Sequence, residues 1–507
     1  MRIEDIDDLS TARQVMRLLE QENSRLLTKL TELTERLSKL LGSDGATQLA
    51  IEIVKLQEEK ALLEKRLFGR SSEKESQAGD GKKKREPKPG HGPREQPELP
   101  IDERIHGFEG AVSCDLCGAH VELWENQFEE SEEITVIQRR FVITQHRRRK
   151  ARCGCYATVV TAPGPPKLIP GGRYSIEFAV DVAVSKYLDH LPLHRQARIM
   201  EREGLVIDSH TLWDQIEALA KHLQPTYDAL RGYVVGKPLV HADETPWYLL
   251  EKPVKKWYVW CVTAEDAAYF WIRGSRSAAV GKEVLDGYSG VVVVDGYKAY
   301  DTLAKENKKL TLAYCWAHVR RKFVEAEMFY PAECKVVLDL IGELYALEKQ
   351  LPNPALLKGD RRREALELRA QVRKDRSLVV IEKIYQWATT QNALPQSALR
   401  KAIDYMFGLW GGLQVFLTNP LVPLDNNAVE RELRGPVVGR KNHYGSRSVR
   451  GTEVSALFYS LIETAKLAGV DPKAYLIYAT KKSIDSPGAS AFPHVLRAKP
   501  SASATPN

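Results

Sequence analysis

Several features that are common in secreted and membrane proteins are scarce or missing in this sequence of 507 residues. No apolar stretch is long enough to cross a bilayer, and the first residues lack the apolar segment of a secretory signal. Cysteine is scarce, with seven residues, which excludes a disulfide-stapled scaffold. Hydrophobic residues make up 43% of the chain, which excludes a mainly disordered protein. We therefore expect a cytoplasmic protein of several domains, with no membrane partner.

Acidic residues are nearly absent from two stretches. Between Arg139 and Arg152 there are seven Arg or Lys and no acid, and between Arg431 and Arg450 there are six against one Glu. Such blocks indicate a polyanion partner, although a solvated basic face is the alternative interpretation. The candidate DNA contacts are Arg147, Arg148, Arg149, Lys150, Arg431, Arg434, Arg440 and Lys441.

Residues 1–68 contain a heptad pattern typical of a coiled coil or leucine zipper. Residues alternate in steps of three and four at Met16, Leu19, Asn23, Leu26, Leu30, Leu33, Leu37 and Leu40. Asn23 occupies an a position, which favours a parallel homodimer, and a higher oligomer is also open. Gly42 and Gly45 are expected to interrupt the helix, so a helical hairpin that packs on itself is the alternative. Residues 69–105 are rich in Ser, Lys, Glu, Gly and Pro and predict a flexible linker.

Four of the seven cysteines form two close pairs within residues 106–162. Two pairs carried on hairpins suit a tetrahedral Zn²⁺, and the run from Ile134 to Thr144 alternates like a strand. We predict a small module with a structural Zn²⁺, since metal ligation would supply much of its folding energy. The candidate zinc ligands are Cys114, Cys117, Cys153 and Cys155.

Residues 173–232 are expected to be helical. A periodic pattern over 176–190 is followed by a helix at 194–202, a stop at Gly204 and an N-cap at Asp208. This outline fits a helix-turn-helix DNA-binding domain, but a simple packing unit of two helices is the alternative.

Residues 233–330 predict the order strand, strand, strand, helix, strand, helix, strand. Asp243 is expected at the end of the first strand and Asp295 at the end of the fourth, Gly290–Val294. This order is typical of a ribonuclease-H-like catalytic core, in which the first and fourth strands lie side by side. Residues 331–415 predict a large helical insertion, and 416–484 the last part of the core. Residues 485–507 predict a disordered tail. The expected fold class is multidomain α/β.

Three acidic residues are the candidate catalytic and metal-binding residues: Asp243, Asp295 and Glu430. Neighbouring carboxylates repel each other unless a cation lies between them, and Mg²⁺ or Mn²⁺ prefers oxygen ligands. Two such ions per active site are a common device for breaking and joining phosphodiester bonds. Asp425 is expected to cap the helix of Glu430, with Asn426 and Asn427 on the same face as active-site support. His318 is expected near the scissile phosphate, and a packed, hydrogen-bonded histidine is equally consistent.

The chain resembles the DDE-type transposases of the insertion-sequence family numbered sixty-six. The motifs that carry the resemblance are Leu67–Lys74, the cysteine pairs, His190–Gln196, Ala242–Thr245, Asp295–Tyr297, Cys315–Phe323, Asp425–Arg431 and Gly439–Asn442. The resemblance implies that Asp243, Asp295 and Glu430 form the metal-binding triad. It also implies that the substrate is double-stranded DNA, namely the terminal inverted repeats of a bacterial mobile element and its target, which puts the protein at the nucleoid. Accessory proteins of the same element are possible further partners.

Two features depart from the family pattern. The basic residue often found two turns after the DDE glutamate is replaced by Val437, so Arg434 or Lys441 takes its place in this interpretation. The tail also lacks the tryptophan-containing end associated with the family. Two rival functions stay open from sequence: a nuclease that only hydrolyses DNA, and a DNA-binding regulator with an inactive core.

Overall fold

The computed structural model describes residues 140–152 and 159–497, with single positions and short runs between 25 and 60. The described N-terminal positions are helical, including Gly45 and the run 47–58. Residues 42–44 lie outside the described residues, so the predicted interruption of the helix at Gly42 and Gly45 stays a prediction. The predicted linker and the four zinc-ligand candidates lie outside the described residues, and coiled-coil pairing stays a prediction.

A short antiparallel ribbon consists of β1 (Lys150–Arg152) and β2 (Val159–Thr161), with Lys150 opposite Thr161. Residues 140–144, the described end of the predicted strand Ile134–Thr144, are not in a strand. That part of the prediction is wrong, because no described strand pairs with these residues, and only Phe141 among their apolar side chains packs on the core. Val142 and Ile143 are 81% and 80% exposed.

Three helices follow, α2 (Ile176–Tyr187), α3 (Leu193–Arg202) and α4 (Ser209–Val235). The two predicted boundary signals between α3 and α4 are confirmed. Gly204 follows α3 with φ +88°, a left-handed conformation that suits glycine. The carboxylate of Asp208 accepts hydrogen bonds from the backbone N–H groups of His210 and Thr211 at 2.7 and 2.8 Å.

One mixed five-stranded sheet lies at the centre of the α/β part, in the order β5-β4-β3-β6-β7. The order of strands and helices along the chain is as predicted, and the first and fourth strands are indeed neighbours, paired in parallel. The β6–β7 pair is also parallel, whereas β3–β4 and β4–β5 are antiparallel. The elements are β3 (Leu239–Leu249), β4 (Lys255–Thr263), β5 (Ala268–Arg273), α5 (Ala278–Val284), β6 (Gly290–Val294), α6 (Lys298–Glu306) and β7 (Leu310–Tyr314).

Two predicted strand ends are wrong. The strand β3 continues for six residues beyond Asp243, because β4 pairs with it as far as Leu249 and Trp247 is fully buried there. Asp243 therefore lies inside a strand. The predicted last strand reached Trp316, but β7 ends at Tyr314. Trp316 begins the next helix because its indole N–H donates to the carbonyl of Leu413 at 3.0 Å.

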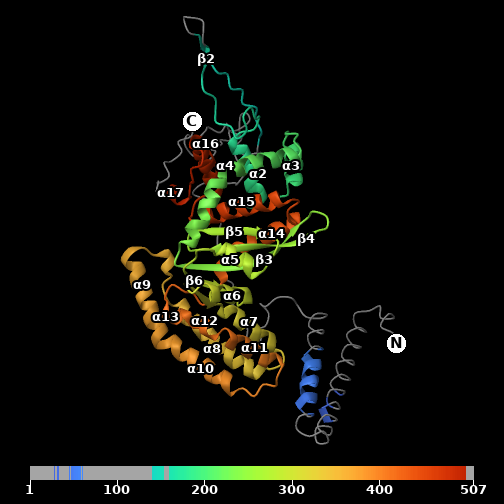
Figure 1. Ribbon diagram of the computed structural model, residues 1–507, viewed down its shortest axis with the longest axis vertical. Helices are drawn as coiled ribbons and strands as arrows, with labels where there is room; N and C mark the ends of the chain where they lie inside the picture. The colour runs from blue at the N-terminus through green and yellow to red at the C-terminus, as the bar shows by residue number, and fades with distance from the viewer. Residues whose placement is uncertain are drawn as a thin grey trace, which may run out of the picture. The chain divides into compact units, whose positions relative to one another are not determined.

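A mainly helical segment separates β7 from the last part of the sheet domain, and its helices lie below the sheet in Figure 1. Its helices are α7 (Trp316–Glu327), α8 (Pro331–Lys349), α9 (Gly359–Val372), α10 (Leu378–Thr390), α11 (Ala398–Gly408), α12 (Trp410–Leu413) and α13 (Val415–Thr418). Two of them, α12 and α13, contact β7. A single π-helical segment, Arg373–Ser377, joins α9 to α10. We call residues 331–415 the helical insertion.

The last helices return to the sheet. They are α14 (Asn427–His443), α15 (Val449–Leu467), α16 (Pro472–Asp485) and α17 (His494–Arg497). Helix α14 packs on β3 and β4, and α15 packs on β5 (Figure 1). The hydroxyl of Ser460 on α15 accepts a hydrogen bond from the backbone N–H of Phe270 at 2.8 Å. Among the described helices, none combines the length and apolar character that a bilayer-spanning segment needs.

The prediction of a disordered tail from residue 485 is wrong for residues 486–497. Ala491 is buried, its backbone N–H donates to Thr226 at 3.1 Å, and its carbonyl accepts from the Tyr475 hydroxyl at 2.9 Å. Phe492 packs on Tyr233 with ring centroids 5.2 Å apart. Phe492 and His494, which both pack on Tyr233, thus help to order a segment whose composition predicts disorder.

Candidate active site

Asp243 lies in β3, and Asp295 directly follows the adjacent strand β6. In the parallel pair β3–β6, His241 is opposite Val293. Asp243 lies two residues beyond His241, and Asp295 lies two residues beyond Val293. Because adjacent strands are about 4.8 Å apart, this register puts the two backbones side by side.

Alternation along β3 sends neighbouring acids to opposite faces of the sheet. His241 faces the start of α14, where its Nδ1 atom lies 2.9 Å from Oδ1 of Asn426. Asp243, two residues on, shares that face. Glu244 points to the other face, where its carboxylate accepts from Arg276 at 2.6 Å and from the Tyr300 hydroxyl at 2.8 Å.

Glu430 belongs to the first turn of α14 and lines the same hollow as Asp243. This hollow is lined by Asp243, Glu244, Thr245, Glu430, Leu433, Arg434, Val437 and Val438. Nε2 of His318 lies 3.9 Å from the Glu430 carboxylate. The other ring nitrogen, Nδ1, is buried and has no hydrogen-bond partner among the described residues. His318 therefore lies beside the hollow as a neighbour of Glu430.

The acids near this hollow influence one another. Burial, followed by the charges of Glu244, Asp295 and Glu430, raises the pKa of Asp243 to about 8. A divalent cation would remove this repulsion, and carboxylate oxygens are the donors that Mg²⁺ and Mn²⁺ prefer, so the residues fit such ions. Within the described part of the chain, no three His, Cys, Asp or Glu side chains form a ready-made cage for one ion. Mg²⁺ is suited to that arrangement because it usually keeps several waters and takes few protein ligands.

The segment Asp425–Asn427, upstream of Glu430, differs in part from expectation. Asp425 accepts a hydrogen bond from the backbone of Asn427 at 3.1 Å, but Asn426 is the N-cap residue. Asn426 is fully buried and donates to the carbonyl of Ala242 at 3.0 Å, so it joins α14 to β3 rather than facing the hollow. Asn427 is exposed. The prediction that Asn426 shares the face of Glu430 is wrong, because the helix begins only after Asn426. Asn427 lies in the first turn, three residues before Glu430.

Glu432 faces away from the hollow, as predicted. It forms a hydrogen bond with Glu463 of α15, and burial together with that neighbour raises the pKa of Glu432 to about 8. Glu463 also pairs with Lys466. The close approach of α14 to α15 at this point is allowed by Gly435 and Gly439, where an added Cβ atom would meet Glu463 and Tyr459.

The basic residues of α14 have different surroundings. Arg431, Arg434 and Lys441 are exposed, and Arg434 lines the hollow beside Glu430. Arg440 instead donates to the carbonyl of Pro246 and so is attached to β3. In the ribbon segment, Arg147, Arg148, Arg149 and Lys150 are all exposed.

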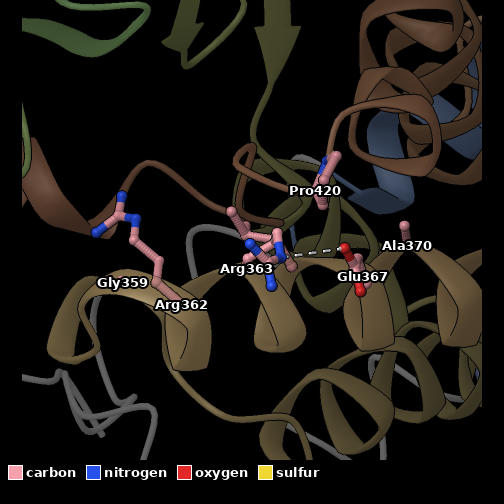
Figure 2. Close-up of a pocket in the computed structure, with 7 residues that line it drawn as sticks. Gly359, Arg362, Arg363, Glu367, Ala370 and Pro420 are labelled. Carbon is pink, nitrogen blue, oxygen red and sulfur yellow. Dashed lines mark ion pairs between the residues drawn. The ribbon is translucent and has the colours of Figure 1, made fainter.

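A second hollow is located on α9, within the helical insertion (Figure 2). Its walls are Gly359, Arg362, Arg363, Leu366, Glu367, Ala370 and Pro420. The one acid in the wall, Glu367, pairs with Arg363. With a single carboxylate already paired, this hollow does not suit phosphodiester chemistry.

Several residues around the acids carry no signal in the sequence. Arg276, Tyr300 and Tyr405 reach the site from a loop, from α6 and from α11, and no motif or spacing connects them with Asp243 or Asp295. The bond between Arg276 and Glu244 becomes visible only when β3 and the loop before α5 are placed together.

Cation binding should depend strongly on pH. Because the Asp243 pKa is raised to about 8, a proton competes with the cation at lower pH, and Mn²⁺ affinity should rise about a hundredfold from pH 6 to pH 9. The folded pKa exceeds the ordinary value of 3.8, so the stability that this group contributes to the cation-free protein is fully present below pH 3.8 and is lost as the pH rises from there to about 8. Calorimetric titration with Mn²⁺ measures the affinity. A Glu432→Gln variant should keep the pH dependence, whereas an unchanged affinity across this range in the native protein would contradict it.

The chain is similar to a family of proteins and to individual relatives. Residues 171–454, which include Asp243, Asp295 and Glu430, match the family model described as transposase IS66 family. Three uncharacterized proteins of Sinorhizobium fredii are related to the chain. y4jD is 34% identical over 65% of the chain and 66% of its own length, slightly under two thirds. y4hP is 28% identical over 75% of the chain and 72% of its own length. y4qI is 30% identical over 80% of the chain and 76% of its own length. This chain, a mixed α/β protein with a central sheet, belongs to the IS66 family of transposases.

Proposed function

We propose that this transposase binds the terminal inverted repeats of its insertion sequence and catalyses metal-dependent nicking and strand transfer. Asp243, Asp295 and Glu430 are the catalytic carboxylates in this proposal. The observation that carries it is the register of β3 and β6, which brings two aspartates to adjacent strands, with Glu430 of α14 lining the same hollow as Asp243.

The sheet supports a ribonuclease-H-like core. In its order, β5-β4-β3-β6-β7, the strands β5, β4 and β3 pair antiparallel, and β6 and β7 continue the sheet in parallel with β3. The first and fourth strands of the core along the chain, β3 and β6, are neighbours. The helical insertion enters between β7 and α14, so Asp295 and Glu430 are far apart in the chain although both influence Asp243.

Each group near the hollow has a role in the proposed reaction. Two Mg²⁺ or Mn²⁺ ions would supply an activated water or DNA 3′-hydroxyl and would balance charge on the leaving oxygen. Asp243, Asp295 and Glu430 hold these ions. Arg434, exposed at the edge of the hollow, binds a DNA phosphate and takes the place of the basic residue that Val437 replaces. His318 contacts Glu430 and orients it.

Exposed basic residues bind the phosphates of the DNA backbone in this proposal. Arg431 and Lys441 flank the hollow on α14, and Arg147, Arg148, Arg149 and Lys150 form a second basic segment. Arg440 is removed from the proposed contacts because it is bound to β3. A structural Zn²⁺ at the four cysteines, a helix-turn-helix formed by α3 and α4, a homodimer through the N-terminal helix and accessory proteins complete the proposal.

The test uses the full chain and labelled DNA that carries the element's terminal repeat. With Mg²⁺ or Mn²⁺, the protein should nick this DNA and join the new 3′ end to a second duplex, and a scrambled repeat should be a poor substrate. Cut products without joined products would indicate a nuclease. Tight binding with no cleavage under any cation would indicate a regulator and overturn the proposal.

A further inference from the structure

The helical insertion touches the turn that carries Asp295. The hydroxyl of Tyr405, on α11, donates a hydrogen bond to the backbone carbonyl of Asp295 at 2.7 Å. Tyr405 is partly buried, and burial together with the charge of Asp295 raises the pKa of its hydroxyl to about 12. A tyrosine hydroxyl is protonated at neutral pH, and this one donates its proton to the carbonyl of Asp295.

The next residue makes this close approach possible. Gly296 has φ +97°, a left-handed conformation that favours glycine. A Cβ atom at Gly296 would lie 2.8 Å from Cδ1 of Leu409 and 3.0 Å from the Tyr405 hydroxyl. The backbone of the turn is therefore in direct contact with α11 and the residue that follows it.

The opposite side of the same turn is held by the sheet domain. The carboxylate of Asp295 accepts a hydrogen bond from the backbone N–H of Tyr297 at 2.9 Å. The Tyr297 hydroxyl donates to the carbonyl of Arg276 at 2.9 Å, and the Arg276 guanidinium lies 4.0 Å from the centre of the Tyr297 ring. The turn from Asp295 to Tyr297 is thus fixed on one side by the core and on the other by the insertion.

We propose that Tyr405 is a positioning residue for Asp295, so that the helical insertion helps to build the active site. This inference rests on the proposed function, in which Asp295 binds a cation. Gly296 is a flexible residue, and the peptide group between Asp295 and Gly296 is oriented by the Tyr405 hydrogen bond. Without that bond the peptide group is free to rotate, and the direction of the Asp295 side chain changes with it.

The two divalent cations Mg²⁺ and Ca²⁺ report on such a change differently. Mg²⁺ demands a nearly ideal octahedral arrangement, whereas Ca²⁺ accepts six to eight oxygen ligands in flexible geometry. A misdirected carboxylate should therefore weaken Mg²⁺ binding more than Ca²⁺ binding. A general loss of packing would weaken both ions alike and lower the melting temperature.

The experiment compares Tyr405→Phe with the native protein and with Tyr385→Phe, an exposed tyrosine of the same insertion. Calorimetric titration should show that Tyr405→Phe binds Mg²⁺ about tenfold more weakly, the effect of one hydrogen bond, with Ca²⁺ affinity changed less than Mg²⁺ affinity. Nicking at saturating terminal-repeat DNA should slow about tenfold, with DNA affinity unchanged. Tyr385→Phe should match the native protein in every measurement, and the three melting temperatures should agree.

Three results would overturn the inference. Unchanged Mg²⁺ binding and nicking in Tyr405→Phe would overturn it while leaving the proposed function intact, because the native protein is active in the same assay. Equal losses of Mg²⁺ and Ca²⁺ binding with a lower melting temperature would assign Tyr405 a merely structural role. No Mg²⁺ binding by the native protein would overturn the inference and the proposed function together.

Discussion

An Asp295→Asn variant should nick and join terminal-repeat DNA about a thousandfold more slowly than the native protein, because the neutral amide is a weaker cation ligand. The substitution is nearly isosteric, and the hydrogen bond from the Tyr297 backbone can still be accepted by the amide oxygen. The fold should therefore persist. Initial rates of nicking, measured with Mg²⁺ at saturating DNA, test this expectation.

The matched control is Asp286→Asn, since Asp286 is an exposed aspartate on the same domain. It should retain the native rate. The burial and repulsion that raise the Asp243 pKa include the charge of Asp295, so Asp295→Asn should also shift that pKa downward. Native rates of nicking and joining in Asp295→Asn would remove Asp295 from the catalytic set.

An Arg373→Ala variant should lose about 3–5 kcal/mol of the free energy of unfolding, because it leaves two buried carbonyls without a donor and leaves Glu348 with Arg369 as its remaining partner. Arg373 is fully buried and pairs with Glu348 at 2.7 Å. It also donates to the carbonyls of Phe416 and Asn419 at 2.8 and 3.1 Å. Those four elements, α8, the π-helical segment, α13 and the loop after it, would lose their shared contact.

Urea denaturation followed by circular dichroism measures this effect, with Arg363→Ala as the control. Arg363 is exposed and pairs on the surface with Asp360. It also pairs with Glu367, as Figure 2 shows, and its loss should cost about 0–1 kcal/mol. Equal unfolding midpoints for Arg373→Ala and Arg363→Ala would show that the buried pair contributes little to the insertion.

Much of the local structure was predictable from the sequence. The run Gly290–Val294 is a buried strand that ends just before Asp295, and Glu430 lies in the first turn of a helix. Apolar runs, capping residues and glycine signals act within a few residues of the chain, so they are readable without coordinates. The same local signals predicted the end of β3 too early in the chain. Trp247 extends the strand because it packs against Ser446 and Tyr459, which lie about two hundred residues away in the sequence.

The arrangement of the site was only partly predictable. The pairing of β3 with β6 follows from the order of the elements, whereas the place of Asn426 does not. Asparagine side chains are mostly exposed, but the amide of Asn426 is buried and bonded to His241 and Ala242. Buried polar groups require partners, and those partners come from wherever the fold brings them.

The sequence by itself determined the family of this transposase, the succession of strands and helices, and the acids that can serve as cation ligands. Only the tertiary structure decided that Glu244 turns to Arg276, that Glu432 turns to Glu463, and that the insertion contacts the Asp295 turn through Tyr405. The physical reason is range. Backbone preferences and periodicity act over one or two turns, whereas hydrogen bonds and charge pairs join any residues that packing of the core makes neighbours.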